Sequence, residues 1–369
     1  MMRLSLQNLT HNIRFNIRDS LAYFIFYVTQ GCNMECAHCF NHLRNQESNR
    51  DLTIEEIDLF SRNLGRIKYM TMAGGEPMLR SKLEIIAKTF YRNNKLDILN
   101  VSTNGWLTDR VISFVEKTLN SCPGLNLAIA VSVDGGRKTH DTLRRKEGSF
   151  DHAVNTLTEL KRVQERVDPN RLAIFAHGTY NAVNAKEFLD TARFFSEKIR
   201  VPYSVALIRG DGLPDDSLSN VDIDHFYFVF KRIIPLVRNG LARNYPFRRA
   251  GVAMADLVGD VIYNSVKHNK MTVPCKAGKK CFVMTADGDV ILCELLNIVL
   301  GNIRDYNYDA MKLLSSEQAL SAIKNIKESK CHCTWECFQL VNVWSSPRML
   351  PKIIGKAVYY GIQDWRNDK

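Results

Sequence analysis

Three cysteines near the start of the chain are the residues best suited to metal chemistry. Cys32, Cys36 and Cys39 follow a Cys-x3-Cys-x2-Cys spacing. A [4Fe–4S] cluster normally takes four thiolates, so three on one loop would hold three irons and leave the fourth iron open. An open coordination position distinguishes catalytic metal sites from closed structural ones. The alternative is a zinc site that borrows His38 or His42, although paired zinc ligands mostly have a two-residue gap.

A second group of cysteines lies in the C-terminal third of the chain. Its members are Cys275, Cys281, Cys293, Cys331, Cys333 and Cys337. The apolar run that begins at Leu21 does not resemble a signal peptide, so we expect a reducing, cytoplasmic location and metal binding rather than disulfides. Asp287-Gly288 predicts a hairpin turn within this region. Structural zinc is the alternative interpretation.

The segment between residues 20 and 210 alternates between strand-like and helix-like patterns. Short apolar runs predict strands at Tyr23–Thr29, Tyr69–Met72, Leu96–Ser102, Asn126–Val133, Leu172–His177 and Tyr203–Ile208. Helical patterns occupy Lys82–Arg92, Asp109–Leu119 and Phe150–Arg166. Thr53 with Glu56, and Asn184 with Glu187, resemble capping boxes that open two more helices. Six β/α units predict an α/β fold, a partial (β/α)6 TIM-like barrel.

Polar and glycine-rich motifs follow the second, third and fourth predicted strands. They are Gly74-Gly75-Glu76-Pro77, Ser102-Thr103-Asn104-Gly105 and Ser132-Val133-Asp134-Gly135. Asn-Gly and Asp-Gly are common turn pairs, so each motif alone has an ordinary explanation. Together with the cysteine loop they mark the carboxyl ends of four strands, where barrels place their active sites.

With these motifs in this order, the chain resembles the radical SAM superfamily. In that family the open iron binds the amine and carboxylate of S-adenosylmethionine. The reduced cluster then cleaves this cofactor to a 5′-deoxyadenosyl radical, which abstracts a substrate hydrogen. The resemblance therefore implies that Cys32, Cys36 and Cys39 are the catalytic cluster ligands, and that His38 matches the aromatic or histidine residue before the last of them.

The resemblance also implies a set of residues around the cofactor. They are His38, Gly74, Gly75, Glu76, Pro77, Thr103, Asn104, Ser132, Asp134, Arg144 and Arg209. Glu76 and nearby carbonyls are expected to accept from the methionyl ammonium, and Arg209 to face the carboxylate. The run His140-Asp141-x-x-Arg144 resembles the subgroup that carries auxiliary clusters.

The C-terminal cysteines resemble the SPASM or twitch extension of that subgroup, a small cysteine-rich domain. The match consists of Cys281 with Gly288-x4-Cys293 and of the Cys333-x3-Cys337 pair, but no cysteine follows Cys337. Six cysteines cannot supply the eight thiolates of two clusters. We therefore expect one auxiliary [4Fe–4S] cluster, bound by Cys275, Cys281, Cys293 and Cys337, with Cys333 or Cys331 competing for the fourth place.

These patterns predict five parts of the chain. They are an extension at 1–20, the radical SAM barrel at 21–212, a helical linker at 213–270, the SPASM/twitch-like domain at 271–345 and a basic amphipathic tail at 346–369. The tail places Ile353, Ile354, Ala357, Val358, Ile362 and Trp365 among Lys352, Lys356 and Arg366. Such a helix packs on its own domain or lies on an anionic membrane as a peripheral contact.

The net charge of +11 suits either a basic surface or an anionic partner. No nucleic-acid motif is present. We expect a small-molecule or lipid- or glycan-linked substrate, with a sugar or glycolipid favoured over a ribosomal peptide or another metabolite. A flavodoxin or ferredoxin would supply the electron. The alternative outside enzymology is a non-catalytic iron–sulfur or zinc module.

Overall fold

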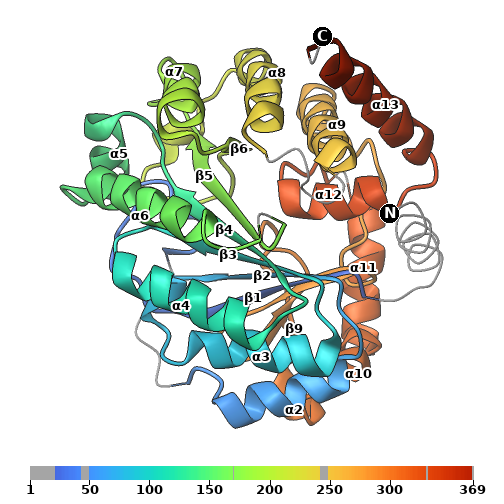
Figure 1. Ribbon diagram of the computed structural model, residues 1–369. Coiled ribbons are helices and arrows are strands. Elements are labelled where there is room, and N and C mark those ends of the chain that lie inside the picture. Colours follow the sequence, from blue (N-terminus) through green and yellow to red (C-terminus); the bar gives the residue numbers. More distant parts are fainter. Residues whose placement is uncertain (1–20, 43–49, 169, 242–247, 330, 368–369) are drawn as a thin grey trace.

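The computed structural model describes residues 21–42, 50–168, 170–241, 248–329 and 331–367. A curved sheet forms the centre of the molecule and helices surround it (Figure 1). The fold is mixed α/β with a parallel sheet, as in a partial TIM barrel, which confirms the predicted fold class. No helix among the described residues is long and apolar enough to cross a membrane.

Within the described residues, nine strands form one sheet in the order β6-β5-β4-β3-β2-β1-β7-β8-β9. The first six are parallel and confirm the predicted strands: β1 (Tyr23–Thr29), β2 (Tyr69–Gly74), β3 (Ile98–Thr103), β4 (Asn126–Ser132), β5 (Leu172–Tyr180) and β6 (Tyr203–Leu207). Strand β1 lies between β2 and β7, and all seven of its residues are buried. This burial explains its uninterrupted apolar run.

Helices cover the outside of the parallel strands. They are α2 (Ile54–Leu64), α3 (Leu83–Asn94), α4 (Thr108–Ser121), α5 (Arg137–Arg144), α6 (Ser149–Gln164) and α7 (Phe188–Arg193). The predicted capping box of α2 is confirmed, because Thr53 and Glu56 exchange hydrogen bonds. The second predicted box is wrong: α7 has no side-chain cap, and the Asn184 carboxamide instead bonds Asn181 and the Asp134 carbonyl.

The C-terminal cysteine region continues the same sheet. Strand β7 (Cys281–Met284) pairs in parallel with β1, and β8 (Asp289–Ile291) and β9 (Val299–Asn302) follow antiparallel. The predicted turn at Asp287-Gly288 joins β7 to β8, with Gly288 at φ +92°. Helices α10 (Ala310–Leu314), α11 (Glu317–Glu328) and α12 (Glu336–Trp344) complete this region.

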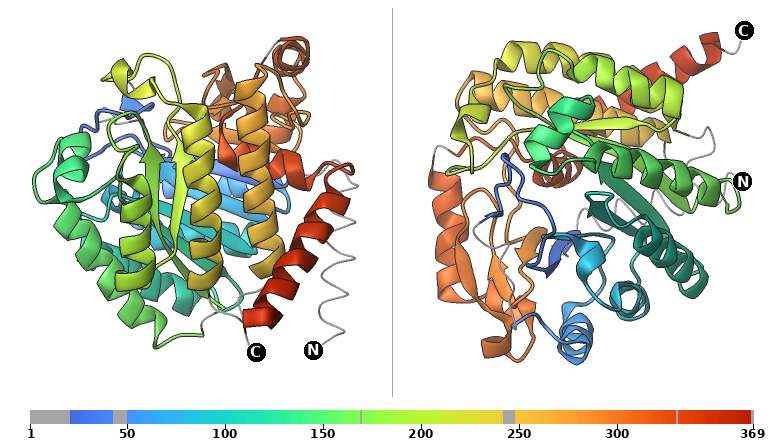
Figure 2. Two further views of the ribbon diagram at one scale, coloured as in Figure 1. Left: turned by 90° about the horizontal axis from the view of Figure 1, so that it is seen from above. Right: turned by 90° about the vertical axis from the view of Figure 1, so that its left-hand side faces the viewer.

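Three long helices lie side by side at one edge of the molecule (Figure 2). They are α8 (Ile223–Gly240), α9 (Arg248–Lys267) and α13 (Leu350–Asn367). Helix α9 lies between the other two and packs against both. The helix predicted for the tail is thus present, and its inner side contacts the rest of the chain.

Candidate active site

The first cysteine group lies on the loop that follows β1, at the carboxyl ends of the parallel strands. Cys36 is buried, whereas Cys32 and Cys39 are half-buried. The Ala37 amide donates to the Leu143 carbonyl at 2.8 Å, which ties the loop to the end of α5. The three thiols are therefore held on one loop with two of them accessible from outside.

The two glycines after β2 are needed for close packing against the cysteine loop. The Gly75 amide donates to the Thr29 carbonyl at 3.0 Å, and the Glu76 amide donates to the Gly31 carbonyl at 2.8 Å. A Cβ atom on Gly75 would lie 2.0 Å from the Gly31 carbonyl oxygen, and one on Gly74 would lie 2.3 Å from that of Thr29. The double glycine therefore sets the position of the loop that carries the thiols.

Glu76 joins the ends of β2 and β3. Its carboxylate accepts from the Thr103 hydroxyl at 2.7 Å, the Asn104 amide at 2.7 Å and the Met78 amide at 3.0 Å. These three hydrogen bonds lower the pKa of the Glu76 carboxyl, but burial raises it by more, so the pKa lies above its usual value. That Glu76 accepts from a cofactor ammonium stays a prediction; within the chain its carboxylate links the two strand ends. Pro77 begins the short 3₁₀ turn that follows (Pro77–Leu79).

Asp134 and Arg144 form a buried ion pair beside Cys36. The Arg144 guanidinium donates to the Asp134 carboxylate at 2.6 Å and lies 3.7 Å from the Cys36 sulfur. Burial alone would raise the pKa of Asp134, but Arg144 and the neighbouring imidazoles lower it below its usual value. The pair thus places a fixed positive charge next to one of the three thiols.

His38 approaches the same Asp134 carboxylate oxygen as Arg144 does. Its Nε2 is 3.5 Å from Asp134, and burial lowers the pKa of the imidazole to about 4. The ring is therefore neutral near pH 7, and its Nδ1 is buried without a hydrogen-bond partner among the described residues. Ser132 ends β4 next to this group and is half-buried.

The His140-Asp141-x-x-Arg144 motif organises the segment after β4. His140 accepts from the Asp134 amide at 3.0 Å. Asp141 caps α6 by accepting from the Gly148 and Phe150 amides at 2.9 and 2.8 Å. His140 and Arg144 thus hold the amide and the carboxylate of the same residue, Asp134, while Asp141 bonds the start of α6.

The three thiols suit a cluster whose irons each take one cysteine. Burial, together with Cys36, Glu76 and Cys39, raises the pKa of the Cys32 thiol to about 11. Ligands to iron are thiolates, so cluster binding must release protons here. No three or more His, Cys, Asp or Glu side chains of the described residues converge to hold a single metal ion. A cluster needs a wider arrangement, because each thiolate binds a different iron.

The second cysteine group surrounds Cys281. Burial raises the pKa of the Cys281 thiol well above its usual value, and Cys275, Cys293, Cys333 and Cys337 add to the effect in that order. The Ala277 amide donates to the Cys275 sulfur and the Trp335 amide to the Cys333 sulfur, each at 3.4 Å. Amide donors of this kind stabilise ligating thiolates. Of the three candidates for the fourth ligand, Cys333 and Cys337 act on Cys281, whereas Cys331 acts on Cys275 and Cys333.

Two carboxylates lie between the cysteine groups, and sequence reasoning did not single them out. Tyr27 of β1 donates to Glu294, and Glu336 accepts from Arg209 at 2.6 Å. Burial raises the pKa of Glu294 to about 7, and its Oε2 has no hydrogen-bond partner among the described residues. Arg209 therefore pairs with the C-terminal region rather than standing free for a cofactor carboxylate. The sequence signal was adjacency, because Glu294 follows Cys293 and Glu336 precedes Cys337.

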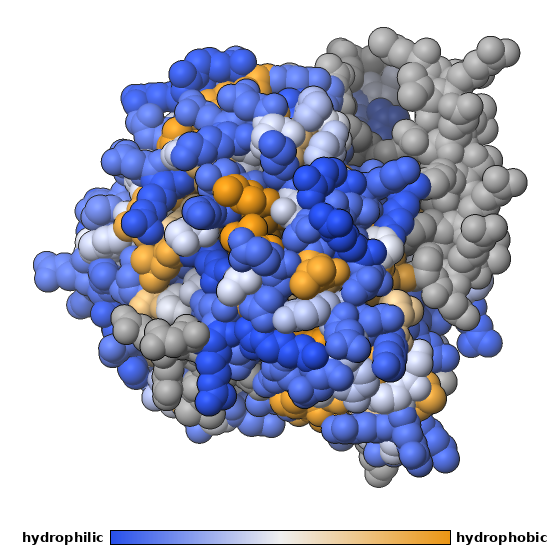
Figure 3. Space-filling model, turned by 90° about the horizontal axis from the view of Figure 1, so that it is seen from below, coloured by the Kyte–Doolittle hydropathy of each residue, from blue (hydrophilic) through white to orange (hydrophobic). Residues whose placement is uncertain are grey.

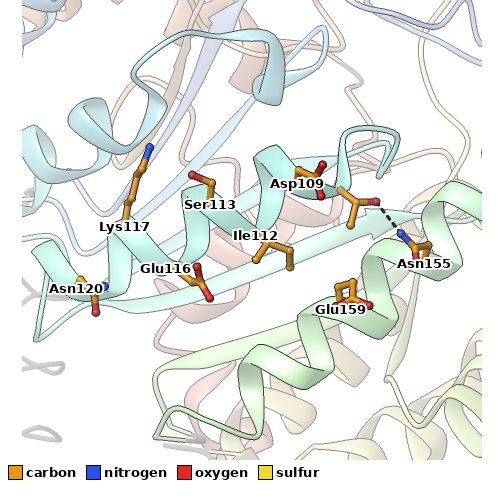
Figure 4. A pocket seen from close by; sticks show the side chains of 9 residues that line it. Asp109, Ile112, Ser113, Glu116, Lys117, Asn120, Asn155 and Glu159 are labelled. Atoms are coloured by element: carbon orange, nitrogen blue, oxygen red, sulfur yellow. Dashed lines mark hydrogen bonds between the residues drawn. The ribbon is translucent and has the colours of Figure 1, made fainter.

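A groove of about 610 Å³ lies elsewhere, between α4 and α6 (Figure 4). Its lining is polar, and the Asn155 amide group donates to the Thr108 hydroxyl across it at 3.2 Å. The groove is lined by no cysteine or histidine and lies apart from the thiols.

Seen from below, the surface of the molecule is mostly hydrophilic with small separate apolar patches (Figure 3).

Comparisons with known proteins agree with this geometry. The profile of the Radical SAM superfamily matches residues 26–195. The chain is 24% identical to the sporulation killing factor maturation protein SkfB of Bacillus subtilis (strain 168), over 82% of this chain and 67% of SkfB. It is 25% identical to the AdoMet-dependent heme synthase of Methanosarcina barkeri (strain Fusaro / DSM 804), over 83% of this chain and 85% of that protein.

Other similarities cover less of the relative or show only the fold. Fe-coproporphyrin III synthase of the same Methanosarcina strain is 31% identical, but the match spans only 36% of its length and 40% of this chain. The crystal structure of Streptococcus suis SuiB bound to S-adenosylmethionine has a TM-score of 0.60 at 14% identity, covering 87% of this chain and 73% of SuiB. Native anSMEcpe with bound AdoMet has a TM-score of 0.55 at 17% identity, covering 95% and 100%.

Proposed function

Because residues 26–195 form a radical SAM domain, we propose that this chain cleaves S-adenosylmethionine reductively and abstracts a hydrogen atom from an organic substrate. The observation that carries the proposal is the packing of the Cys32–Cys39 loop on the double glycine and the Asp134–Arg144 pair. When bound, the cluster and S-adenosylmethionine supply the radical chemistry, and the protein supplies binding, orientation and exclusion of water.

Each surrounding residue has a role in this proposal. Cys32, Cys36 and Cys39 hold the cluster, and Gly74 and Gly75 let the next strand end approach that loop. Arg144 keeps a positive charge 3.7 Å from the Cys36 sulfur, and hydrogen bonds to ligating sulfurs tune cluster potentials. Glu76 acts as a positioning residue for the ends of β2 and β3.

The auxiliary [4Fe–4S] cluster is assigned to Cys275, Cys281, Cys293 and Cys337, with Cys333 or Cys331 as the competing fourth ligand. The substrate is placed between the two cysteine groups. Two contacts lie there, between Tyr27 and Glu294 and between Arg209 and Glu336. Their hydroxyl, carboxyl and guanidinium groups suit a polar substrate.

We favour a peptide as the substrate class. SkfB carries the word maturation in its name, and SuiB has been crystallised with the precursor peptide SuiA. The sugar or glycolipid favoured by the sequence has no support among these relatives. A tetrapyrrole is the second candidate, because two heme-related synthases are among them. The electron donor, a flavodoxin or ferredoxin, remains part of the proposal.

Iron analysis of the anaerobically reconstituted chain tests the two-cluster assignment. We expect about eight irons per chain, and about four after the triple change Cys32→Ala, Cys36→Ala, Cys39→Ala. The triple change Cys275→Ala, Cys281→Ala, Cys293→Ala should also leave about four. Cys122→Ser is the matched control, since Cys122 lies in the core outside both groups. Zinc in place of iron at either group would overturn the assignment of that group.

Deuterium transfer tests the substrate class. Peptides deuterated at their side chains, or a tetrapyrrole deuterated at its side chains, are incubated with the reduced enzyme and S-adenosylmethionine. The proposal predicts deuterium in 5′-deoxyadenosine with at least one peptide. Transfer from the tetrapyrrole alone would replace the peptide by the second candidate.

A further inference from the structure

Helix α13 exposes a row of large apolar side chains on its outer face. Leu350, Ile354, Val358, Ile362 and Trp365 are between 46% and 58% exposed. Their spacing of three or four residues places them on one side of the helix. A helix on the surface of a globular domain ordinarily turns such a row inward and its polar residues outward.

The inner face of α13 is fixed by a separate set of contacts. Ile353 and Tyr360 are buried against the rest of the chain. The Tyr360 hydroxyl donates to Asp256 of α9 at 2.8 Å, and Lys356 pairs with both Asp256 and Asp260. These bonds anchor the helix to α9, so the apolar row on the opposite side is not its packing face.

The surroundings of the apolar row are basic. Arg348, Lys352 and Arg366 are exposed beside it. Asp364 is the single carboxylate between Leu350 and Asn367, and it is turned inward, 3.2 Å from Arg249. The outer face therefore combines aliphatic and indole side chains with positive charge, on a chain whose net charge is +11.

We propose that the outer face of α13 docks on an anionic lipid bilayer. The apolar row enters the boundary between headgroups and acyl chains while the helix lies parallel to the surface. Arg348, Lys352 and Arg366 extend their charged ends to lipid phosphates. The charge complementarity selects an anionic bilayer over an apolar protein partner. Docking is independent of the proposed radical chemistry.

Vesicle co-sedimentation of the full-length holoenzyme tests the proposal. We expect binding to phosphatidylglycerol–phosphatidylcholine vesicles, weaker binding to pure phosphatidylcholine, and release by added salt. The double change Ile354→Glu, Val358→Glu should lower the partition coefficient about tenfold or more, because two aliphatic side chains no longer enter the bilayer.

A control variant separates surface docking from a general effect of charge. Leu59→Glu, Ile85→Glu introduces the same two carboxylates on α2 and α3, at the end of the molecule away from α13 (Figure 1). This variant should bind vesicles as the unchanged protein does, and both variants should keep their far-UV circular dichroism. Failure of the unchanged chain to sediment with anionic vesicles would overturn the proposal. So would a dimer in solution that only Ile354→Glu, Val358→Glu dissociates, since a second copy would then cover the face.

Discussion

At the scale of single residues, Gly75 leaves no room for a side chain. Its Cβ would meet the Gly31 carbonyl at 2.0 Å, so Gly75→Ala should displace the loop that carries Cys32. We expect a folded chain that binds about four fewer irons after reconstitution, measured by iron analysis and circular dichroism. Gly251→Ala is the control, because nothing lies within 4 Å of that position. Full iron loading of the Gly75 variant would contradict the packing argument.

The Asp134–Arg144 pair makes a prediction about stability. Asp134 is fully buried and Arg144 is 11% exposed, so Arg144→Met leaves a buried carboxylate without its partner. The free energy of unfolding should fall by roughly 3–5 kcal/mol. The double variant Arg144→Met, Asp134→Asn should be less destabilised than Arg144→Met, measured by urea denaturation at pH 7. If the losses of unfolding free energy of the two single variants simply add in the double variant, the two side chains are not coupled and the prediction is wrong.

Short motifs allowed most of this site to be predicted from the sequence. The cysteine loop, the double glycine and Asp134 fall where barrel geometry requires them, at carboxyl ends of neighbouring strands. The role of Glu76 could not be predicted, because its bonds to Thr103 and Asn104 depend on how two strand ends meet. Glu294 was missed for the same reason, since its contact with Tyr27 spans 267 positions of the chain.

At the scale of elements, Glu56 links α2 to the C-terminal region. It accepts from the Arg304 guanidinium at 2.6 Å and the Tyr308 hydroxyl at 3.0 Å. These donors, with Arg304 the largest cause, lower the pKa of Glu56 from 4.5 to about 2. The stabilisation is therefore complete above about pH 4.5 and is lost as the pH falls toward 2.

Glu56→Gln tests this link. At pH 7 the variant should lose roughly 1–2 kcal/mol of unfolding free energy, a figure reduced for the partial exposure of Arg304. The difference from the unchanged protein should be full at pH 7 and clearly smaller at about pH 3, inside the window between about 4.5 and about 2, measured by urea denaturation. Glu116→Gln serves as the control, because its carboxylate is half-exposed and lies 3.9 Å from Arg166. An equal loss at both pH values would contradict the linkage.

Some helices and strands were predicted correctly from the sequence, and others were not. Strand β1 was located because seven successive buried residues leave a clear apolar run. The pairing of β7 with β1 was not predicted, since it joins residues more than 250 positions apart and no local pattern encodes it. The start of α7 was placed wrongly because the Asn184 carboxamide bonds Asn181 and Asp134 instead of capping the helix.

At the scale of the whole molecule, the β1–β7 pairing brings the two cysteine groups to one sheet. Cys281 begins β7 directly beside Tyr23 at the start of β1, whereas the Cys32 loop follows the other end of β1. The two groups are thus about one strand length apart, and the contact between Tyr27 and Glu294 lies between them. In the function that we propose, the substrate would be held between the two groups.

The central claim is that the Cys32 loop generates a radical from S-adenosylmethionine. Its most direct test is anaerobic incubation of the reconstituted chain with dithionite and S-adenosylmethionine, followed by chromatography for 5′-deoxyadenosine. The account predicts that 5′-deoxyadenosine and methionine form, and that the variant lacking Cys32, Cys36 and Cys39 forms neither. Iron-loaded protein that yields no 5′-deoxyadenosine, or a triple variant that yields as much as the unchanged chain, would contradict it.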